Sequence, residues 1–143
     1  RRLVEHGTKF VTLHYGGWDM HSNISNALKS KVAPIDKAIS GFLQDIWDRG
    51  MNEKVLLVVT GEFGRTKINA NAGRDHWPAI TPMMMAGGSY QSGRTIGEAD
   101  RSYSPTENPF GPLDLFGIGI GTQRIDMSGR PRYLLEGEAK VIL

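Results

Sequence analysis

The sequence predicts an α/β fold of three layers, αβα, with a mostly parallel sheet between two layers of helices. Residues 9–14 and 55–60 are short runs rich in β-branched and apolar residues, which is typical of strands. Between them, the apolar residues of 25–49 recur at steps of three and four, which is typical of an amphipathic helix. A strand, a helix and a second strand in this order form a βαβ unit with parallel strands. The run at 55–60 is apolar throughout, so we expect a central strand that is covered on both faces.

The first half of the chain gives clear signals for helix ends. Residues 1–6 read as the end of a helix, with Gly7 as its C-terminal cap. Pro34 lies inside the helical pattern of 25–49 and is expected either to kink that helix or to begin a second one. Gly50 is the expected end of the helical region.

The second half is less regular. Residues 66–73 are polar and punctuated by glycine, so we expect a loop. Residues 80–86 predict a third strand, more weakly, and a short strand is expected at 94–97. A short helix is expected at 113–120, and no element is assigned to 122–143.

Composition excludes several classes of function. The 143 residues fit one domain, and no apolar run approaches the roughly 20 residues of a membrane-spanning helix. The net charge of +2 is small and the basic residues are scattered, which argues against a nucleic acid or an anionic membrane as the main partner. The absence of cysteine excludes disulfides, a thiolate zinc site and a cysteine nucleophile. The chain begins at Arg1 without a methionine, so we expect a partial domain.

Asp19 and His21 follow the first predicted strand. Residues two apart in an extended segment point to the same side, so both side chains are able to reach one metal ion. Carboxylates and imidazoles are the common ligands of hydrolytic metal ions. The alternative is that Asp19 caps the following helix and His21 is solvated.

Glu62 and Arg65 follow the second predicted strand. Ligands of open α/β sheets bind at the carboxyl ends of the strands, which favours a functional carboxylate at Glu62. The alternative is a surface glutamate in a turn. Arg65 is suited either to hold an anionic group of a substrate or to pair with Glu62.

Asp75 and His76 are two further candidate ligands. Adjacent side chains point in different directions, so one is expected to bind a metal and the other to orient a neighbouring ligand. The alternative is a loop histidine that stacks on Trp77.

Three motifs then carry a resemblance to a known family: Gly-Gly-Trp-Asp-Met-His at 16–21, Val-Val-Thr-Gly-Glu-Phe-Gly-Arg-Thr at 58–66 and Gly-Arg-Asp-His-Trp-Pro at 73–78. Together they resemble the C-terminal part of a bacterial family of unknown function in the alkaline phosphatase superfamily, which includes sulfatases and phosphodiesterases. The resemblance is strong over 1–97. It implies an alkaline phosphatase-like fold in which residues 1–143 form the metal-binding C-terminal portion of one domain, with the upstream part absent.

The resemblance also implies a set of metal ligands. Asp19 and His21 match the superfamily's aspartate and histidine on one metal, and His76 matches the later histidine that completes this site. Glu62-Phe63 stands where the superfamily has an Asp-His pair on the second metal, so the carboxylate is kept and the imidazole is lost. An alternative alignment takes Asp75-His76 as that pair.

The activity implied by the resemblance is metal-dependent hydrolysis of phosphate or sulfate esters, on a small molecule or a polymer. One or two divalent ions are expected, most simply zinc, with Glu62 and Asp75 near the second. Arg65 or Arg74 would neutralise the substrate's oxygens. The nucleophile is expected upstream of this chain, and the location to be periplasmic or secreted. The alternative is a non-catalytic, exported binding or envelope protein with a degraded site. A purely structural metal site is a third possibility.

Overall fold

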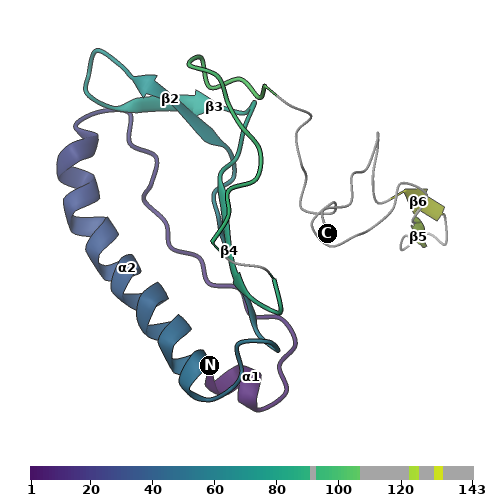
Figure 1. Cartoon of the computed structure of the whole chain (residues 1–143). Coiled ribbons are helices and arrows are strands. Elements are labelled where there is room, and N and C mark those ends of the chain that lie inside the picture. Colours follow the sequence, from purple (N-terminus) through teal and green to yellow (C-terminus); the bar gives the residue numbers. More distant parts are fainter. Residues whose placement is uncertain (91–92, 107–122, 126–130, 134–143) are drawn as a thin grey trace. The chain divides into compact units, whose positions relative to one another are not determined.

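The computed structural model describes residues 1–90, 93–106, 123–125 and 131–133. The chain forms two compact units, residues 1–95 and 96–143. The first unit contains two helices and four strands: α1 (Arg2–Glu5), α2 (Ile24–Asp48), β1 (Leu56–Thr60), β2 (Gly64–Ile68), β3 (Arg74–Trp77) and β4 (Met83–Gly87) (Figure 1).

The predicted three-layer αβα fold with a mostly parallel sheet is wrong. The described strands form three separate two-stranded sheets, and each pair is antiparallel. β1 pairs with β4, from Leu56 opposite Gly87 to Thr60 opposite Met83. The strands predicted at 55–60 and 80–86 therefore exist. Their pairing differs from the prediction, which expected parallel strands. After β1 the chain passes through β2 and β3, and β4 then runs antiparallel beside β1.

The first predicted strand does not form. Residues 9–14 adopt no strand, and the side chains of Phe10 and Leu13 are 86% and 87% exposed. The chain pairs with the rest of the unit only further along, where the N–H groups of Asn23 and Ile24 donate to the carbonyls of Asn71 and Ala72 at 3.0 and 2.8 Å. With no partner strand beside residues 9–14, the βαβ unit is absent.

Helix α2 closely follows its prediction. It runs from Ile24 to Asp48 as one helix through Pro34, so no second helix begins there. Gly50 adopts a φ of +63°, and its N–H donates to the carbonyl of Trp47 at 2.9 Å. This is the helix end that the glycine predicted. Ile46, near that end, is the most buried apolar side chain among the described residues, at 1% exposure.

Ion pairs connect the short helix α1 and the residue before it to the C-terminal part of α2 (Figure 1). Asp45 accepts from Arg1 at 3.0 Å and from Arg49 at 2.8 Å. Arg49 also lies 3.7 Å from Glu5 of α1. The hydrogen bond from Arg49 lowers the pKa of Asp45. Gly7 caps α1 as predicted, since its N–H donates to the carbonyl of Val4 at 2.9 Å.

A β-hairpin replaces the loop predicted at 66–73. In it, β2 and β3 pair antiparallel, with Gly64 opposite Trp77 and Arg65 opposite His76. The register is irregular between Arg65 and Ile68. Figure 1 shows this hairpin close to the N-terminal end of α2, where residues 20–24 bond to its turn. The hairpin therefore brings residues 65–76 next to the segment that precedes α2.

In the second unit, β5 (Gln123–Ile125) pairs antiparallel with β6 (Pro131–Tyr133). The strand predicted at 94–97 is absent from the described residues. The helix predicted at 113–120 lies outside them.

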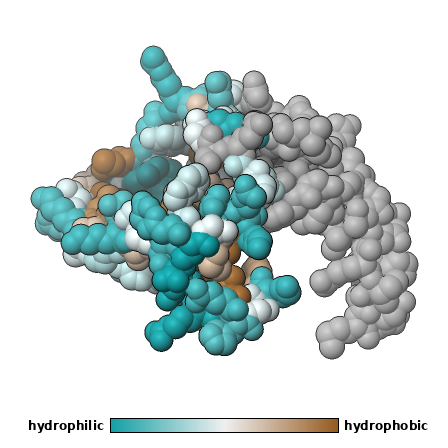
Figure 2. All heavy atoms as spheres, turned by 60° about the horizontal axis from the view of Figure 1, so that its bottom comes forward, coloured by the Kyte–Doolittle hydropathy of each residue, from teal (hydrophilic) through white to brown (hydrophobic). Residues whose placement is uncertain are grey.

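Few apolar side chains of the described residues are fully buried, and many are half-buried or exposed. Met20 and Ile46 are the buried apolar residues among them, and brown apolar groups appear at several places between hydrophilic ones in Figure 2. Within the described ranges, no helix combines the length and apolar character needed to cross a membrane.

Candidate metal centre

The first two residues of the candidate centre lie on the extended segment before α2. Met20 is buried, and its carbonyl accepts a hydrogen bond from the N–H of Arg74 at 2.9 Å. Asp19 and His21 flank it, and their side chains are 58% and 47% exposed. This alternation of buried and exposed side chains is that of an extended backbone. It leaves the carboxylate and the imidazole on the same side.

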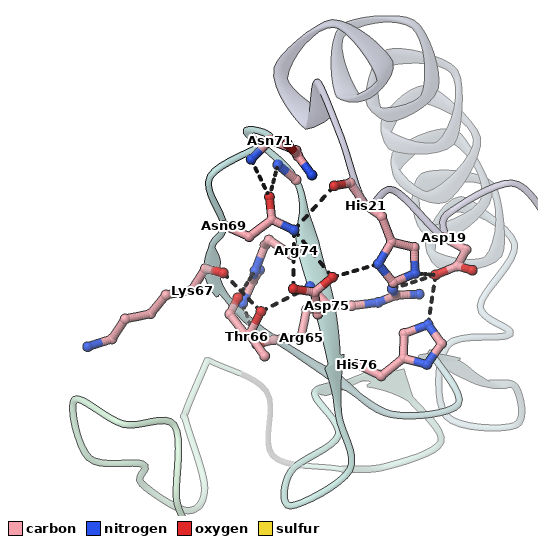
Figure 3. Close-up of polar contacts among 11 residues, drawn as sticks. Asp19, His21, Arg65, Thr66, Lys67, Asn69, Asn71, Arg74, Asp75 and His76 are labelled. Carbon is pink, nitrogen blue, oxygen red and sulfur yellow. Dashed lines mark hydrogen bonds and ion pairs between the residues drawn. The ribbon is translucent and has the colours of Figure 1, made fainter.

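His76 reaches the same point from β3. Its Nε2 lies 2.9 Å from Oδ1 of Asp19, and Nε2 of His21 lies 2.9 Å from the same oxygen. One ligand atom from each of the three residues lies within 4.8 Å of the other two. Figure 3 shows both rings facing the Asp19 carboxylate. Residues 19 and 76 are thus brought together by the hairpin and the segment bonded to it.

Arg65 contributes a positive charge to this cluster. It is the cross-strand partner of His76, and its Nη1 donates to Oδ1 of Asp19 at 2.6 Å. The ring of Phe63 lies 4.5 Å from the ring of His76 and 5.4 Å from Cζ of Arg65. Arg65 therefore pairs with Asp19, a partner that differs from the Glu62 considered in the sequence.

The cluster has a strongly perturbed carboxylate. The hydrogen bonds from His76 and Arg65 lower the pKa of Asp19 from 3.8 to about 2. Asp19 is consequently ionised at neutral pH and faces three nitrogen groups with one oxygen. An oxygen in this setting is able to exchange hydrogen-bond donors for a metal cation.

Asp75 contacts the opposite nitrogen of His21. The Nδ1 of His21 lies 2.7 Å from Oδ1 of Asp75, and this hydrogen bond is the main cause of the raised pKa of His21. The same bond, followed by that of Asn69, lowers the pKa of Asp75. Asp75 therefore lies behind His21, whereas Asp19 and His76 lie in front of it.

Two imidazoles and one carboxylate that converge in this way form the donor set of hydrolytic zinc sites. The His76 side chain is 48% exposed, similar to Asp19 and His21. The centre is therefore accessible to solvent, and its donor set fits a divalent ion with a free coordination position.

Comparison with protein families identifies the family of this chain. A family model described as "Protein of unknown function (DUF1501)" matches residues 1–130. The chain belongs to the DUF1501 family. The searches of curated proteins and of solved structures gave no match. Every candidate residue of this DUF1501 chain lies inside the matched range.

Two further residues singled out in the sequence stay outside the cluster. Glu62 is exposed and is not a member of the group whose ligand atoms lie within 4.8 Å of one another. Arg74 points its guanidinium at the backbone of β2, where it donates to the carbonyls of Thr66 and, at 2.7 Å, of Arg65. Arg74 thus holds the hairpin of this DUF1501 chain, and Arg65 is the arginine beside the candidate centre.

Asn69 and the hairpin turn that it closes are not among the features predicted from the sequence. Asn69 bonds to Asp75, to the His21 carbonyl and to two N–H groups of its own turn. The signal was present, because Asn-Ala-Asn-Ala-Gly at 69–73 is rich in residues that form hairpin turns. It was hidden because β2 and β3 are polar and lack an apolar alternation.

Proposed function

We propose that this DUF1501 chain carries the metal centre of a hydrolase that cleaves phosphate or sulfate esters. The observation that carries the proposal is the convergence of Asp19, His21 and His76, whose ligand atoms lie within 4.8 Å of one another. These residues come from segments 55 or more positions apart, so sequence proximity alone does not explain their meeting. A bound divalent ion supplies Lewis-acid chemistry, by polarising an ester oxygen and lowering the pKa of water.

Arg65 supports the choice of an anionic ester. Its guanidinium lies 2.6 Å from Asp19, at the edge of the cluster, and its side chain is 19% exposed. A guanidinium offers paired N–H donors that match the oxygens of phosphate and sulfate. In the proposed function Arg65 binds the non-bridging oxygens of the substrate.

A single ion is favoured over two. Phe63 occupies the position at which the superfamily motif has the second histidine, and its ring packs against His76 at 4.5 Å. Glu62 stands apart from the three converging residues. We propose one divalent ion, most simply zinc, held by two imidazoles and a carboxylate.

A relationship of DUF1501 to the alkaline phosphatase superfamily is part of the proposal. It is supported by the order of candidate ligands along the chain: an aspartate with a nearby histidine, and then a later histidine. The three-layer fold expected from that resemblance is not part of it.

A second candidate function is a non-catalytic, exported binding or envelope protein. Phe63 favours it, since a phenyl ring at a ligand position cannot bind metal. The Arg65–Asp19 ion pair favours it as well, because it already satisfies the carboxylate without a cation.

Zinc binding tests the proposed centre. We expect the purified chain to bind about one equivalent of zinc, and Asp19→Ala and His76→Ala to lose it, because each removes one of three ligands. His6→Ala is the matched control, since His6 bonds to the backbone of α1 and is outside the cluster. Metal content by mass spectrometry and titration against a chromogenic chelator give the measurement. Unchanged zinc binding in both ligand variants would reject the centre.

Activity separates the two candidate functions. Zinc-loaded protein is assayed with an aryl phosphate and an aryl sulfate, in parallel with His76→Ala. Turnover that disappears in the variant supports the hydrolase. Zinc binding that depends on His76, with neither turnover nor binding of inorganic phosphate or sulfate to the zinc-loaded protein, supports the binding protein.

A further inference from the structure

We propose that Asn69 and Asp75 are positioning residues that turn His21 so that its Nε2 binds the metal. This inference rests on the proposed function and names the part of the site that sets the geometry of one ligand. It concerns Asn69 above all, which carries no charge and binds no metal.

The contact between Asp75 and His21 defines the role of each ring nitrogen. An ionised carboxylate only accepts hydrogen bonds, so Nδ1 of His21 carries the hydrogen in its 2.7 Å bond to Asp75. A histidine that binds a metal must be neutral, and in that form the lone pair is then on Nε2. This is the nitrogen that lies 2.9 Å from Oδ1 of Asp19. The Asp75 contact therefore selects both the tautomer and the direction of the ligand nitrogen.

Asn69 holds Asp75 in place. Its Nδ2 donates to Oδ1 and Oδ2 of Asp75 at 3.2 and 3.1 Å, and to the carbonyl of His21 at 3.2 Å. The same amide group thus touches the carboxylate and the backbone of the histidine that the carboxylate orients. Figure 3 shows Asn69, Asp75 and His21 connected in this way.

The orientation of the Asn69 amide is itself fixed. Its Oδ1 accepts from the N–H groups of Asn71 and Gly73, each at 3.0 Å. A reversed amide would point N–H groups at N–H groups on one side and an oxygen at a carboxylate on the other. The turn of the hairpin therefore determines where the donor group of Asn69 points, and through it the position of Asp75.

The experiment compares Asn69→Ala and Asp75→Ala with Asn71→Ala in the full chain. The Asn71 variant is the matched control, because Asn71 contributes its backbone N–H to the network and keeps it after truncation. Zinc affinity is measured by titration against a competing chelator. Loss of such a supporting contact typically weakens metal binding about 10–100-fold, and we expect this range for the Asn69 and Asp75 variants. We expect less than about a twofold change for Asn71→Ala.

A second measurement reports orientation separately from folding. Long-range proton–nitrogen correlation spectra of the imidazoles identify which nitrogen of His21 carries hydrogen. We expect hydrogen on Nδ1 of zinc-bound wild-type protein, and a mixture of tautomers or ligation through Nδ1 in Asp75→Ala. Circular dichroism shows whether each variant is folded, and if Asn69→Ala is unfolded, Asp75→Ala decides alone.

The outcomes are distinct. Wild-type zinc affinity in both Asn69→Ala and Asp75→Ala, with hydrogen still on Nδ1, would overturn the inference. A wild-type chain that binds no zinc would reject the proposed function instead. In that case the spectra of the metal-free chain test the inference. Nδ1 of His21 is expected to carry hydrogen in the wild type, and this preference is expected to weaken in Asp75→Ala.

Discussion

One carboxylate oxygen determines the chemistry of the centre at the residue scale. Oδ1 of Asp19 lies within 2.9 Å of Nε2 of both histidines and 2.6 Å from Nη1 of Arg65. These donors satisfy the charge that a metal cation would otherwise satisfy. Metal binding therefore competes with hydrogen bonds that already exist, and Arg65 is the one competitor that cannot lose its proton.

Replacing Arg65 should separate metal binding from anion binding. We expect Arg65→Gln to tighten zinc binding by up to about tenfold, because a positive charge next to the cation is removed. The same change should weaken inhibition of zinc-loaded protein by inorganic phosphate, or phosphate binding where there is no turnover. The zinc affinity is measured by titration with zinc, and the phosphate affinity by titration with phosphate at a fixed zinc concentration.

Lys67→Gln is the control for this pair of measurements. Lys67 lies on the same strand and carries the same charge, and its side chain points away from the cluster in Figure 3. Both affinities are expected to stay near those of the wild type. Zinc and phosphate affinities that move together in Arg65→Gln would contradict the role given to Arg65.

At this scale, part of the site was predictable from the sequence. The spacing of Asp19 and His21 was informative because an extended backbone repeats every two residues. Asp75 and Arg65 were noticed, but their partners were not, because those partners depend on how β2 and β3 pair. The proposed role of His76 as a ligand stays a prediction until metal is measured.

At the scale of elements, the β2–β3 hairpin and the extended segment before α2 form the site together. The carbonyls of the hairpin's turn accept from the N–H groups of Asn23 and Ile24, and its strands carry Arg65 and His76 opposite each other. Residues 64–77 lack an apolar alternation, which is why the pattern at 66–73 predicts a loop. Hydrogen bonds of the backbone and of Asn69 stabilise the hairpin in place of an apolar face.

Gly73 tests whether the hairpin must lie against the segment before α2. A Cβ at this position would collide with the carbonyl group of His21 and the nitrogen of Ser22. Backbone atoms cannot move aside without moving the segment. We therefore expect Gly73→Ala to separate His21 from His76 and to weaken zinc binding at least about tenfold, as loss of ligand support does.

Gly41 provides the matched control. It lies inside α2, and a Cβ there meets no atom within 4 Å. Gly41→Ala should leave zinc affinity unchanged and stabilise the helix by about 0.5–1 kcal/mol, since alanine loses less backbone entropy than glycine. Wild-type zinc affinity in Gly73→Ala would show that the site does not need this contact.

At the scale of the whole molecule, the fold prediction failed because an apolar run does not specify its neighbour. Residues 9–14 and 55–60 both contain β-branched and apolar residues, yet the second segment pairs with β4 while the first pairs with no strand among the described residues. An isolated extended segment buries little, which is why Phe10 is 86% exposed. Strand composition was therefore a sound guide to β1 and β4, and a poor guide to the direction of the sheet.

The scarcity of buried apolar groups leads to a last prediction, on stability. Met20 and Ile46 are the buried apolar side chains among the described residues, so we expect polar contacts such as those of the candidate centre to contribute to the stability of the first unit. An ion bound by Asp19 and His76 would join the segment before α2 to β3, and a ligand that binds only the folded state stabilises it. We expect zinc at about 100-fold above its Kd to raise the thermal midpoint by several degrees.

Two controls accompany this measurement. His76→Ala should show no such rise, and magnesium, which prefers oxygen ligands, should have little effect on the wild type. An equal rise in His76→Ala would place the stabilising zinc elsewhere on the chain.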